Sequence, residues 1–95
     1  MSENNGVSEE KRVALLGIMV SDKDAAAAVN RVLHDFESHI VGRMGLPLRE
    51  QNINAISVVL VATSNTVNAL TGKLGALSGV AAKALFAQPK PVNKQ

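Results

Sequence analysis

Two short segments of this chain are apolar on both sides of an extended backbone. Residues 13–20 read VALLGIMV and contain no polar side chain. Residues 56–62 read ISVVLVA, so one alternating set is wholly apolar and the other contains only Ser57, Val59 and Val61. Short runs of this composition are typical of β-strands. Since two helices can cover only one face of an antiparallel sheet, we predict a second face that is too apolar to be left in water.

Two other segments have the period of amphipathic helices. In each, apolar residues recur three and four positions apart, which places them on one face of a helix. In the first segment they are Val29, Val32, Leu33 and Phe36, and in the second they are Val67, Leu70, Leu74 and Leu77. The sequence therefore predicts two helices, each with one buried face.

The ends of these helices are predicted from residues that favour caps. Ser21 precedes the first helix and is followed three residues later by Asp24, which is the spacing of a capping box. Ser64 or Thr66 can cap the second helix in the same way. Gly79 lies where the left-handed residue that ends a helix is expected.

Two further segments complete a predicted sheet. Residues 40–47 are predicted to form a strand that contains two glycines, and Leu46–Ile53 a loop. Residues 54–62 form the strand that contains the second apolar segment, and Val80–Phe86 forms the last strand. The order strand, helix, strand, strand, helix, strand favours an α+β, ferredoxin-like βαββαβ sandwich. We therefore predict a four-stranded antiparallel sheet with both helices on one face.

The chain has a length of 95 residues, which supports one domain, and we assign this domain to residues 11–88. Residues 1–10 and 89–95 are polar, have no apolar period, and are predicted to be disordered tails. Because polar tails cannot cover an apolar sheet face, we predict a homo-oligomer, a dimer or tetramer, that forms through the sheet face or a sheet edge.

Composition excludes several functions. The chain has no cysteine, which excludes disulfides, zinc–thiolate sites, iron–sulfur clusters and a cysteine nucleophile. Two Phe and no Trp or Tyr argue against a stacking platform for single-stranded nucleic acid. The net charge of +2 comes from cations that are mixed with acidic neighbours, which indicates a solvated surface. The longest apolar run falls far short of the ~20 residues that span a bilayer, so we expect a cytoplasmic protein without a membrane partner.

The two histidines do not form an obvious metal site. His34 and His39 are five residues apart, about 140° around a helix. Asp35 or Glu37 could complete a mixed site, but a surface histidine that is favoured by the dipole at a helix C-terminus is the better interpretation. We therefore predict no metal and no cofactor. No serine, histidine and carboxylate have the spacing of a catalytic triad, and we expect a protein that is not an enzyme.

The segment Gly72-Lys73-Leu74-Gly75 resembles phosphate-binding loops in spelling. It is not a P-loop, because Leu74 stands where Ser or Thr must reach magnesium and Val67 stands where a glycine is required. It does match the GXXG loop of KH domains, which makes an RNA-binding module the alternative function. We prefer to interpret these glycines as small residues that allow a helix to approach the sheet.

Three longer stretches carry a family resemblance. They are residues 29–43 (VNRVLHDFESHIVGR), 44–62 (MGLPLREQNINAISVVLVA) and 68–85 (NALTGKLGALSGVAAKAL). Together they resemble the iron-only hydrogenase system regulator family. The resemblance implies a small stand-alone ACT-like domain, similar to the C-terminal domain of nickel-responsive regulators. It also implies a small effector or a protein partner that is sensed at a subunit interface.

The resemblance does not extend to the nickel site or to the DNA-binding arm of the nickel regulators. A site of that type needs cysteine and more histidines than this chain contains. Residues 1–10 are too few and too polar for a ribbon-helix-helix, so no direct contact with nucleic acid is expected.

A loop rich in glycine, proline and paired charges is the first choice for a ligand or subunit contact. The candidate residues for this contact are Arg43, Gly45, Pro47, Arg49, Glu50 and His34.

Overall fold

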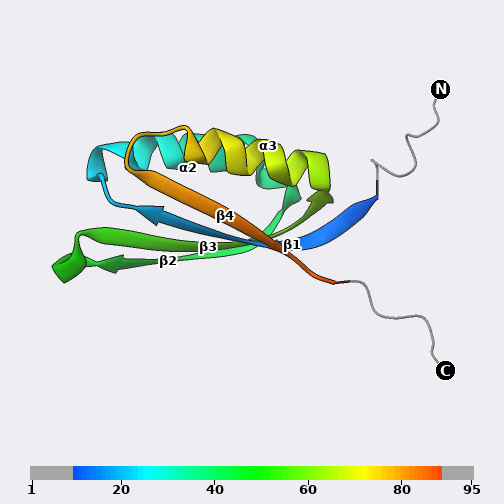
Figure 1. Cartoon of the computed structure of the whole chain (residues 1–95), viewed down its shortest axis with the longest axis horizontal. Coiled ribbons are helices and arrows are strands. Elements are labelled where there is room, and N and C mark those ends of the chain that lie inside the picture. Colours follow the sequence, from blue (N-terminus) through cyan, green and yellow to red (C-terminus); the bar gives the residue numbers. More distant parts are fainter. Residues whose placement is uncertain (1–9, 89–95) are drawn as a thin grey trace.

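The computed structural model describes residues 10–88 and contains the predicted strands and helices in the predicted order (Figure 1). The strands are β1 (Lys11–Val20), β2 (Ile40–Leu48), β3 (Ile53–Thr63) and β4 (Val80–Phe86), and the helices are α2 (Ala26–Asp35) and α3 (Ser64–Gly75). Short 3-10 turns lie at Lys23–Ala25, Glu37–His39 and Arg49–Gln51. Apart from Glu10, the predicted tails lie outside the described residues.

The four strands form one antiparallel sheet in the order β2-β3-β1-β4. Both helices lie on the same side of this sheet (Figure 1). The prediction of an α+β, ferredoxin-like βαββαβ sandwich is therefore confirmed. Among residues 10–88, no helix has the length and apolar character that a membrane crossing requires.

The core lies between the helices and one face of the sheet. Along β1, every second residue is buried, beginning with Ala14 and ending with Val20. Both predicted helical faces supply side chains to the core. The fully buried large side chains are Leu16, Ile18, Val29, Leu33, Val58, Leu60, Val67, Leu70 and Leu74. Each contributes about 1.5–3 kcal/mol relative to exposure, so this single layer holds the helices on the sheet.

Both predicted helix caps are wrong by at least one residue. Asp22, and not Ser21, caps the first helical turn, because its side chain accepts a hydrogen bond from the Asp24 N–H at 2.9 Å. Thr63 caps α3 and accepts from the Thr66 N–H at 3.1 Å. Strand β3 extends as far as Thr63, so the last extended residue is the one that is placed to cap the helix.

Gly79 closes the turn into β4 and does not end α3. Helix α3 ends at Gly75, and Leu77 packs against the core from outside the helix. Gly79 has the predicted left-handed backbone, with φ of 76°. Its carbonyl accepts hydrogen bonds from the Ser21 N–H at 2.8 Å and from the Ser21 hydroxyl at 3.1 Å. Gly79 therefore ties the end of β1 to the start of β4.

The predicted loop at Leu46–Ile53 is shorter than expected. Residues 46–48 belong to β2, and only the turn at 49–52 connects it to β3, with Asn52 in the left-handed region at φ 56°. Pro47 is tolerated in β2 because this is an edge strand, where one side of the backbone needs no partner. The hairpin is thus longer and more regular than its proline and glycines suggest.

The Gly72–Gly75 segment is the last turn of α3 and not a loop. Leu74 is fully buried in the core. A clamp of the KH type needs this segment to protrude between two helices, so the RNA-binding alternative has no support. The preferred interpretation is also wrong, because a Cβ placed on Gly72 or Gly75 would meet nothing within 4 Å.

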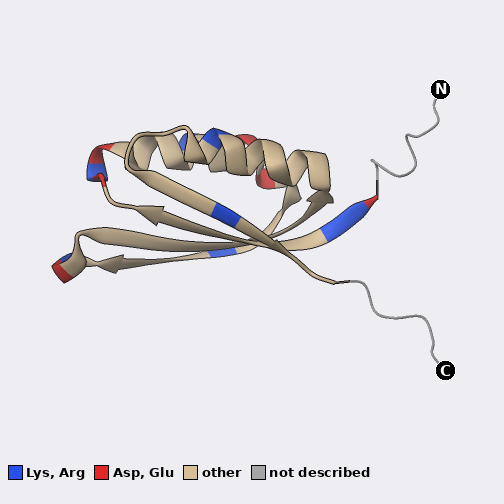
Figure 2. Cartoon of the chain, in the orientation of Figure 1, with Lys and Arg blue, Asp and Glu red and all other residues tan. Residues whose placement is uncertain are grey.

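The face of the sheet opposite the helices is apolar and open in the single chain, as predicted for β1 and β3. We call it the open face. Large exposed apolar residues occur on all four strands, and they are Val13, Leu15, Met19, Val41, Met44, Leu46, Leu48, Val59 and Leu85. Charged residues gather on the helices, on the turns and at the start of β1, and the rest of the sheet has only Arg43 on β2 and Lys83 on β4 (Figure 2). The open face is therefore the largest feature that the fold leaves without an apolar partner.

Candidate functional site

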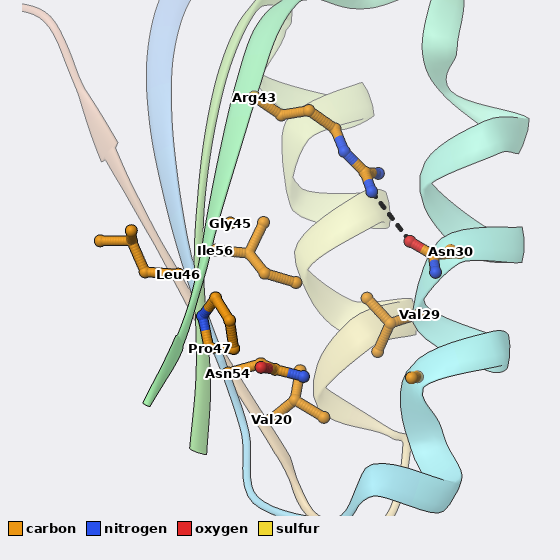
Figure 3. Close-up of a pocket in the computed structure, with 10 residues that line it drawn as sticks. Val20, Val29, Asn30, Arg43, Gly45, Leu46, Pro47, Asn54 and Ile56 are labelled. Carbon is orange, nitrogen blue, oxygen red and sulfur yellow. Dashed lines mark hydrogen bonds between the residues drawn. The ribbon is translucent and has the colours of Figure 1, made fainter. Parts of the chain in front are cut away.

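A cavity of about 250 Å³ lies between edge strand β2 and helix α2 (Figure 3). It is lined by Val20, Ala26, Val29, Asn30, Arg43, Gly45, Leu46, Pro47, Asn54 and Ile56. Its walls are mostly aliphatic, and its polar groups are one guanidinium and two amides. A small concave site of this make-up is what a ligand with an apolar body and one polar group requires.

The register of β2 explains why the cavity exists. Arg43, Gly45 and Pro47 pair with Val58, Ile56 and Asn54, on the side of the sheet that faces the helices. Gly45 contributes no side chain, and a Cβ there would meet only Ile56 Cγ1 at 3.9 Å. Every residue of β2 after Ile40 is exposed. The helices therefore leave a gap at this edge.

A bulge near the start of β2 sets which residues face the cavity. The register shifts between Ile40, which pairs with Leu60, and Gly42, which pairs with Val59. A bulge adds one unpaired residue to its strand, and here that residue is Val41. Side chains alternate between faces, so the extra residue directs Arg43 toward α2 and Met44 toward the open face.

Arg43 connects β2 to α2 through a single hydrogen bond. Its Nη2 donates to Oδ1 of Asn30 at 2.9 Å, and both side chains lean toward each other across the mouth of the cavity (Figure 3). Among residues 10–88, no carboxylate lies within 4.0 Å of the Arg43 guanidinium. A guanidinium has five N–H donors in a planar fork, so most of them are available to an anionic group.

His34 lies on the other side of the Arg43–Asn30 bond. A shallow depression there is lined by Asn30, His34, Glu37 and Arg43, among others. Nδ1 of His34 is 3.3 Å from Oε1 of Glu37, and both side chains are well exposed. His34 occupies the last turn of α2, as the interpretation of a surface histidine requires. Within residues 10–88, no three His, Cys, Asp or Glu side chains are grouped as metal ligands.

The structure brings together three of the six candidate residues. Arg43, Gly45 and Pro47 line one cavity, whereas Arg49 and Glu50 lie in the turn beyond it. Arg49 instead lines a smaller depression of about 130 Å³ that shares Pro47 with the cavity. Whether any of the six binds a ligand stays a prediction.

The sequence analysis missed the two amides of the cavity. Asn30 lies off the apolar face of its helix, which indicates exposure but not a partner. Asn54 pairs with Pro47 across the hairpin. The register of that hairpin is the signal that could have identified Asn54. It depends on where the turn begins, and the turn was predicted too long.

Solved structures with a similar fold include the following two. The structure of the uncharacterized protein TM1266 from Thermotoga maritima matches with a TM-score of 0.80 and 41% sequence identity, covering 83% of this chain and 100% of that chain. An unknown protein from Galdieria sulphuraria matches with a TM-score of 0.62 and 14% identity, covering 87% of this chain and 49% of that chain. The second likeness shows the fold alone. No curated protein matches the chain.

A family model covers nearly all the described residues. It is the TM1266-like model, described as "Iron-only hydrogenase system regulator, putative", and it matches residues 12–84. The matched range includes every residue that lines the cavity between β2 and α2. It confirms the resemblance on which the sequence analysis relied, and the family's description is that of a regulator. With this match and 41% identity to TM1266, the chain belongs to the TM1266-like family of that description.

Proposed function

We propose that this chain is a non-enzymatic regulatory module that works in the cytoplasm as a homo-oligomer and senses a small ligand or a protein partner at a subunit interface. The observation that carries the proposal is the open face. Leu15, Met44 and Leu85 are 44%, 60% and 67% exposed there. Monomeric proteins rarely expose contiguous apolar patches of more than a few hundred Å². The family description, which names a regulator, supports the regulatory part.

Strand β2 offers a physical connection between ligand and assembly. Its residues alternate, so Gly45 and Pro47 face the cavity, while the side chains of Met44 and of Leu46, which also borders the cavity, lie on the opposite face. Figure 3 shows Leu46 pointing away from the helices. A ligand that draws β2 toward α2 would therefore also move apolar side chains of the open face. Coupling of this kind needs only that the ligand bind one assembly state better than the other.

The oligomer is tested by adding a charge to the open face. We expect wild-type protein at micromolar concentration to scatter light as an assembly of at least two chains. The Leu15→Glu variant should scatter as a single chain of 10.0 kDa, because a carboxylate would have to be buried in the contact without a partner. Leu15 is already half exposed in the single chain, so the variant should keep the helical circular dichroism of the wild type.

The matched control is Asn68→Glu, which makes the same change of charge on the exposed surface of α3. It should leave the mass of the assembly unchanged. Wild-type protein that stays a stable, folded monomer would refute the homo-oligomer.

The ligand is tested at Arg43. We use isovalerate, a carboxylate with a branched apolar body, and inorganic phosphate as probes in calorimetric titrations. We expect a probe to bind, and the Arg43→Gln variant should weaken its Kd by roughly 10- to 100-fold, the usual loss for a hydrogen bond to a charged group. Arg31→Gln is the control, because Arg31 is an exposed arginine of α2 that does not line the cavity.

Equal losses in the Arg43 and Arg31 variants would mean that only net charge matters, which contradicts a site at Arg43. If neither probe binds and the native mass spectrum of protein purified from its source retains no small molecule, the small-ligand part of the proposal fails.

A further inference from the structure

We propose that two copies of this chain stack open face to open face about a two-fold axis that runs parallel to the strands, between β1 and β3. The inference rests on the homo-oligomer proposed above and specifies which surface is shared and in which orientation. It follows from the strand register, from the sizes of the side chains on the open face, and from the position of the one lysine among them.

The register arranges the open face in rows that cross the four strands. In the order β2, β3, β1 and β4, the central row contains Met44, Ser57, Gly17 and Lys83. The row on one side contains Leu46, Ala55, Met19 and Ala81. The row on the other side contains Gly42, Val59, Leu15 and Leu85. Each outer row thus mixes large and small side chains, and the middle of the central row is low because Gly17 and Ser57 are small.

An axis parallel to the strands exchanges β1 with β3 and β2 with β4 within each row. Leu46 of one copy then faces the partner's Ala81, and Met19 faces the partner's Ala55. In the other outer row, Leu85 faces the partner's Gly42, while Leu15 faces the partner's Val59. Large side chains therefore meet small ones at the first three of these positions, as interdigitated packing between stacked sheets requires.

The charge on the open face favours the same axis. Lys83 is the one charged residue in these three rows of the described sheet. It lies on edge strand β4, and the proposed axis puts it over the partner's Met44. Its alkyl chain can cover that side chain while the ammonium group reaches water at the rim. The two Lys83 side chains then lie at opposite edges, roughly 14 Å apart at ~4.8 Å per strand.

A two-fold axis across the strands would give a poorer contact. This axis places each strand over the same strand of the partner. Lys83 would then face the partner's Lys83, and Leu15 would face the partner's Met19. That arrangement brings two like charges together at one edge of the contact. Pairing through the sheet edges would leave the open face uncovered, so it does not remove the apolar surface that calls for a partner.

The open face supplies much of the contact area that a stable dimer needs. Four strands at ~4.8 Å spacing and three rows at ~6.6 Å give these rows a flat footprint of roughly 400 Å². Because the side chains protrude to different heights, the accessible area is larger than this footprint and increases toward the ~800 Å² per partner that is standard for specific interfaces. A second copy fits this face better than a charged partner would, because homodimer contacts are the most apolar class and the charge here lies at the edge.

The orientation is tested by cross-linking between engineered thiols, since the chain has no cysteine of its own. A mixture of the Leu46→Cys and Ala81→Cys variants is treated with a short bis-maleimide after subunit exchange. On a denaturing gel, we expect a band to move from the single-chain mass of 10.0 kDa to twice that mass. Either variant alone should give no such band, because its two thiols lie at opposite edges. A mixture of the Leu85→Cys and Gly42→Cys variants is a second test and should also cross-link.

The mixture of Leu46→Cys and Gly42→Cys is the contrast. It should stay at the single-chain mass, whereas an axis across the strands would link it. Linkage of that mixture, or of Leu46→Cys with itself, overturns the proposed axis. Light scattering of the same samples separates the two proposals. A dimer that gives neither expected cross-link removes this geometry and leaves the homo-oligomer standing, and a monomer removes both.

Discussion

Replacing Leu16 by alanine is expected to lower the free energy of unfolding by about 3–5 kcal/mol. Leu16 is fully buried in the middle of β1 and belongs to the core cluster to which both helices contribute. Alanine would leave a cavity there that a single packed layer cannot close. The loss in free energy of unfolding is then the sum of two parts, the transfer free energy of the removed atoms and the packing contacts that they made. For a domain with a total stability of only about 5–15 kcal/mol, this is a large fraction. Urea unfolding followed by circular dichroism measures it.

Leu15→Ala is the matched control, because it makes the same change one residue earlier on the opposite face of β1. Leu15 is 44% exposed in the single chain, so its loss should be below about 1 kcal/mol at high dilution. At concentrations where the chains associate, the loss should grow, because stability that comes from association depends on concentration. The loss at Leu16 should stay constant. Equal losses at both positions at every concentration would contradict this assignment of the two faces.

Gly79→Ala is expected to destabilise the fold by about 2–5 kcal/mol. Two independent costs add at this position. The backbone is left-handed, which costs an L-residue about 1–2 kcal/mol. The new Cβ would also lie 2.5 Å from the Cβ of Asp22, and relieving that overlap requires a backbone shift of about 1–3 kcal/mol. The shift would disturb the hydrogen bonds from Ser21 to the Gly79 carbonyl. Chemical unfolding in urea again provides the measurement.

Gly72→Ala should have the opposite sign. Gly72 lies within α3, and a Cβ there meets nothing within 4 Å. Alanine should stabilise the helix by about 0.5–1 kcal/mol. The pair therefore distinguishes a glycine that the fold requires from one that it tolerates. A Gly79→Ala variant within about 0.5 kcal/mol of wild type would show that the turn can relax freely.

The fold could be predicted because its periodic signals are local. The helical faces that contain Val29, Leu33, Leu70 and Leu74 are the buried faces in the structure. The wrong predictions concern the residues at which helices and strands begin or end. The cap residue of α3 depends on where β3 stops, which is decided by pairing with β1 and not by the sequence near Thr63. Leu77 continues the helical period although it lies beyond the helix, because packing against the core does not require helical backbone.

The candidate site could be predicted only in part. Arg43, Gly45 and Pro47 alternate along one strand, so their common face follows once the strand is recognised. Asn30 could not be assigned to them, because its hydrogen bond to Arg43 joins residues thirteen positions apart on different elements. Arg49 and Glu50 were grouped with the site because charged loop residues often bind ligands, but the shorter turn places them past its end.

The unpaired residue near the start of β2 sets the phase of everything that follows in that strand. Deleting Val41 would make the ladder regular, because Gly42 would follow Ile40 as Val59 follows Leu60, and Arg43 would keep its side of the sheet. Pairing Val41 regularly would have the opposite effect, since every later residue of β2 would slip by one. Arg43 would then stand on the aliphatic side of the sheet, and Met44 would point into the space under α2.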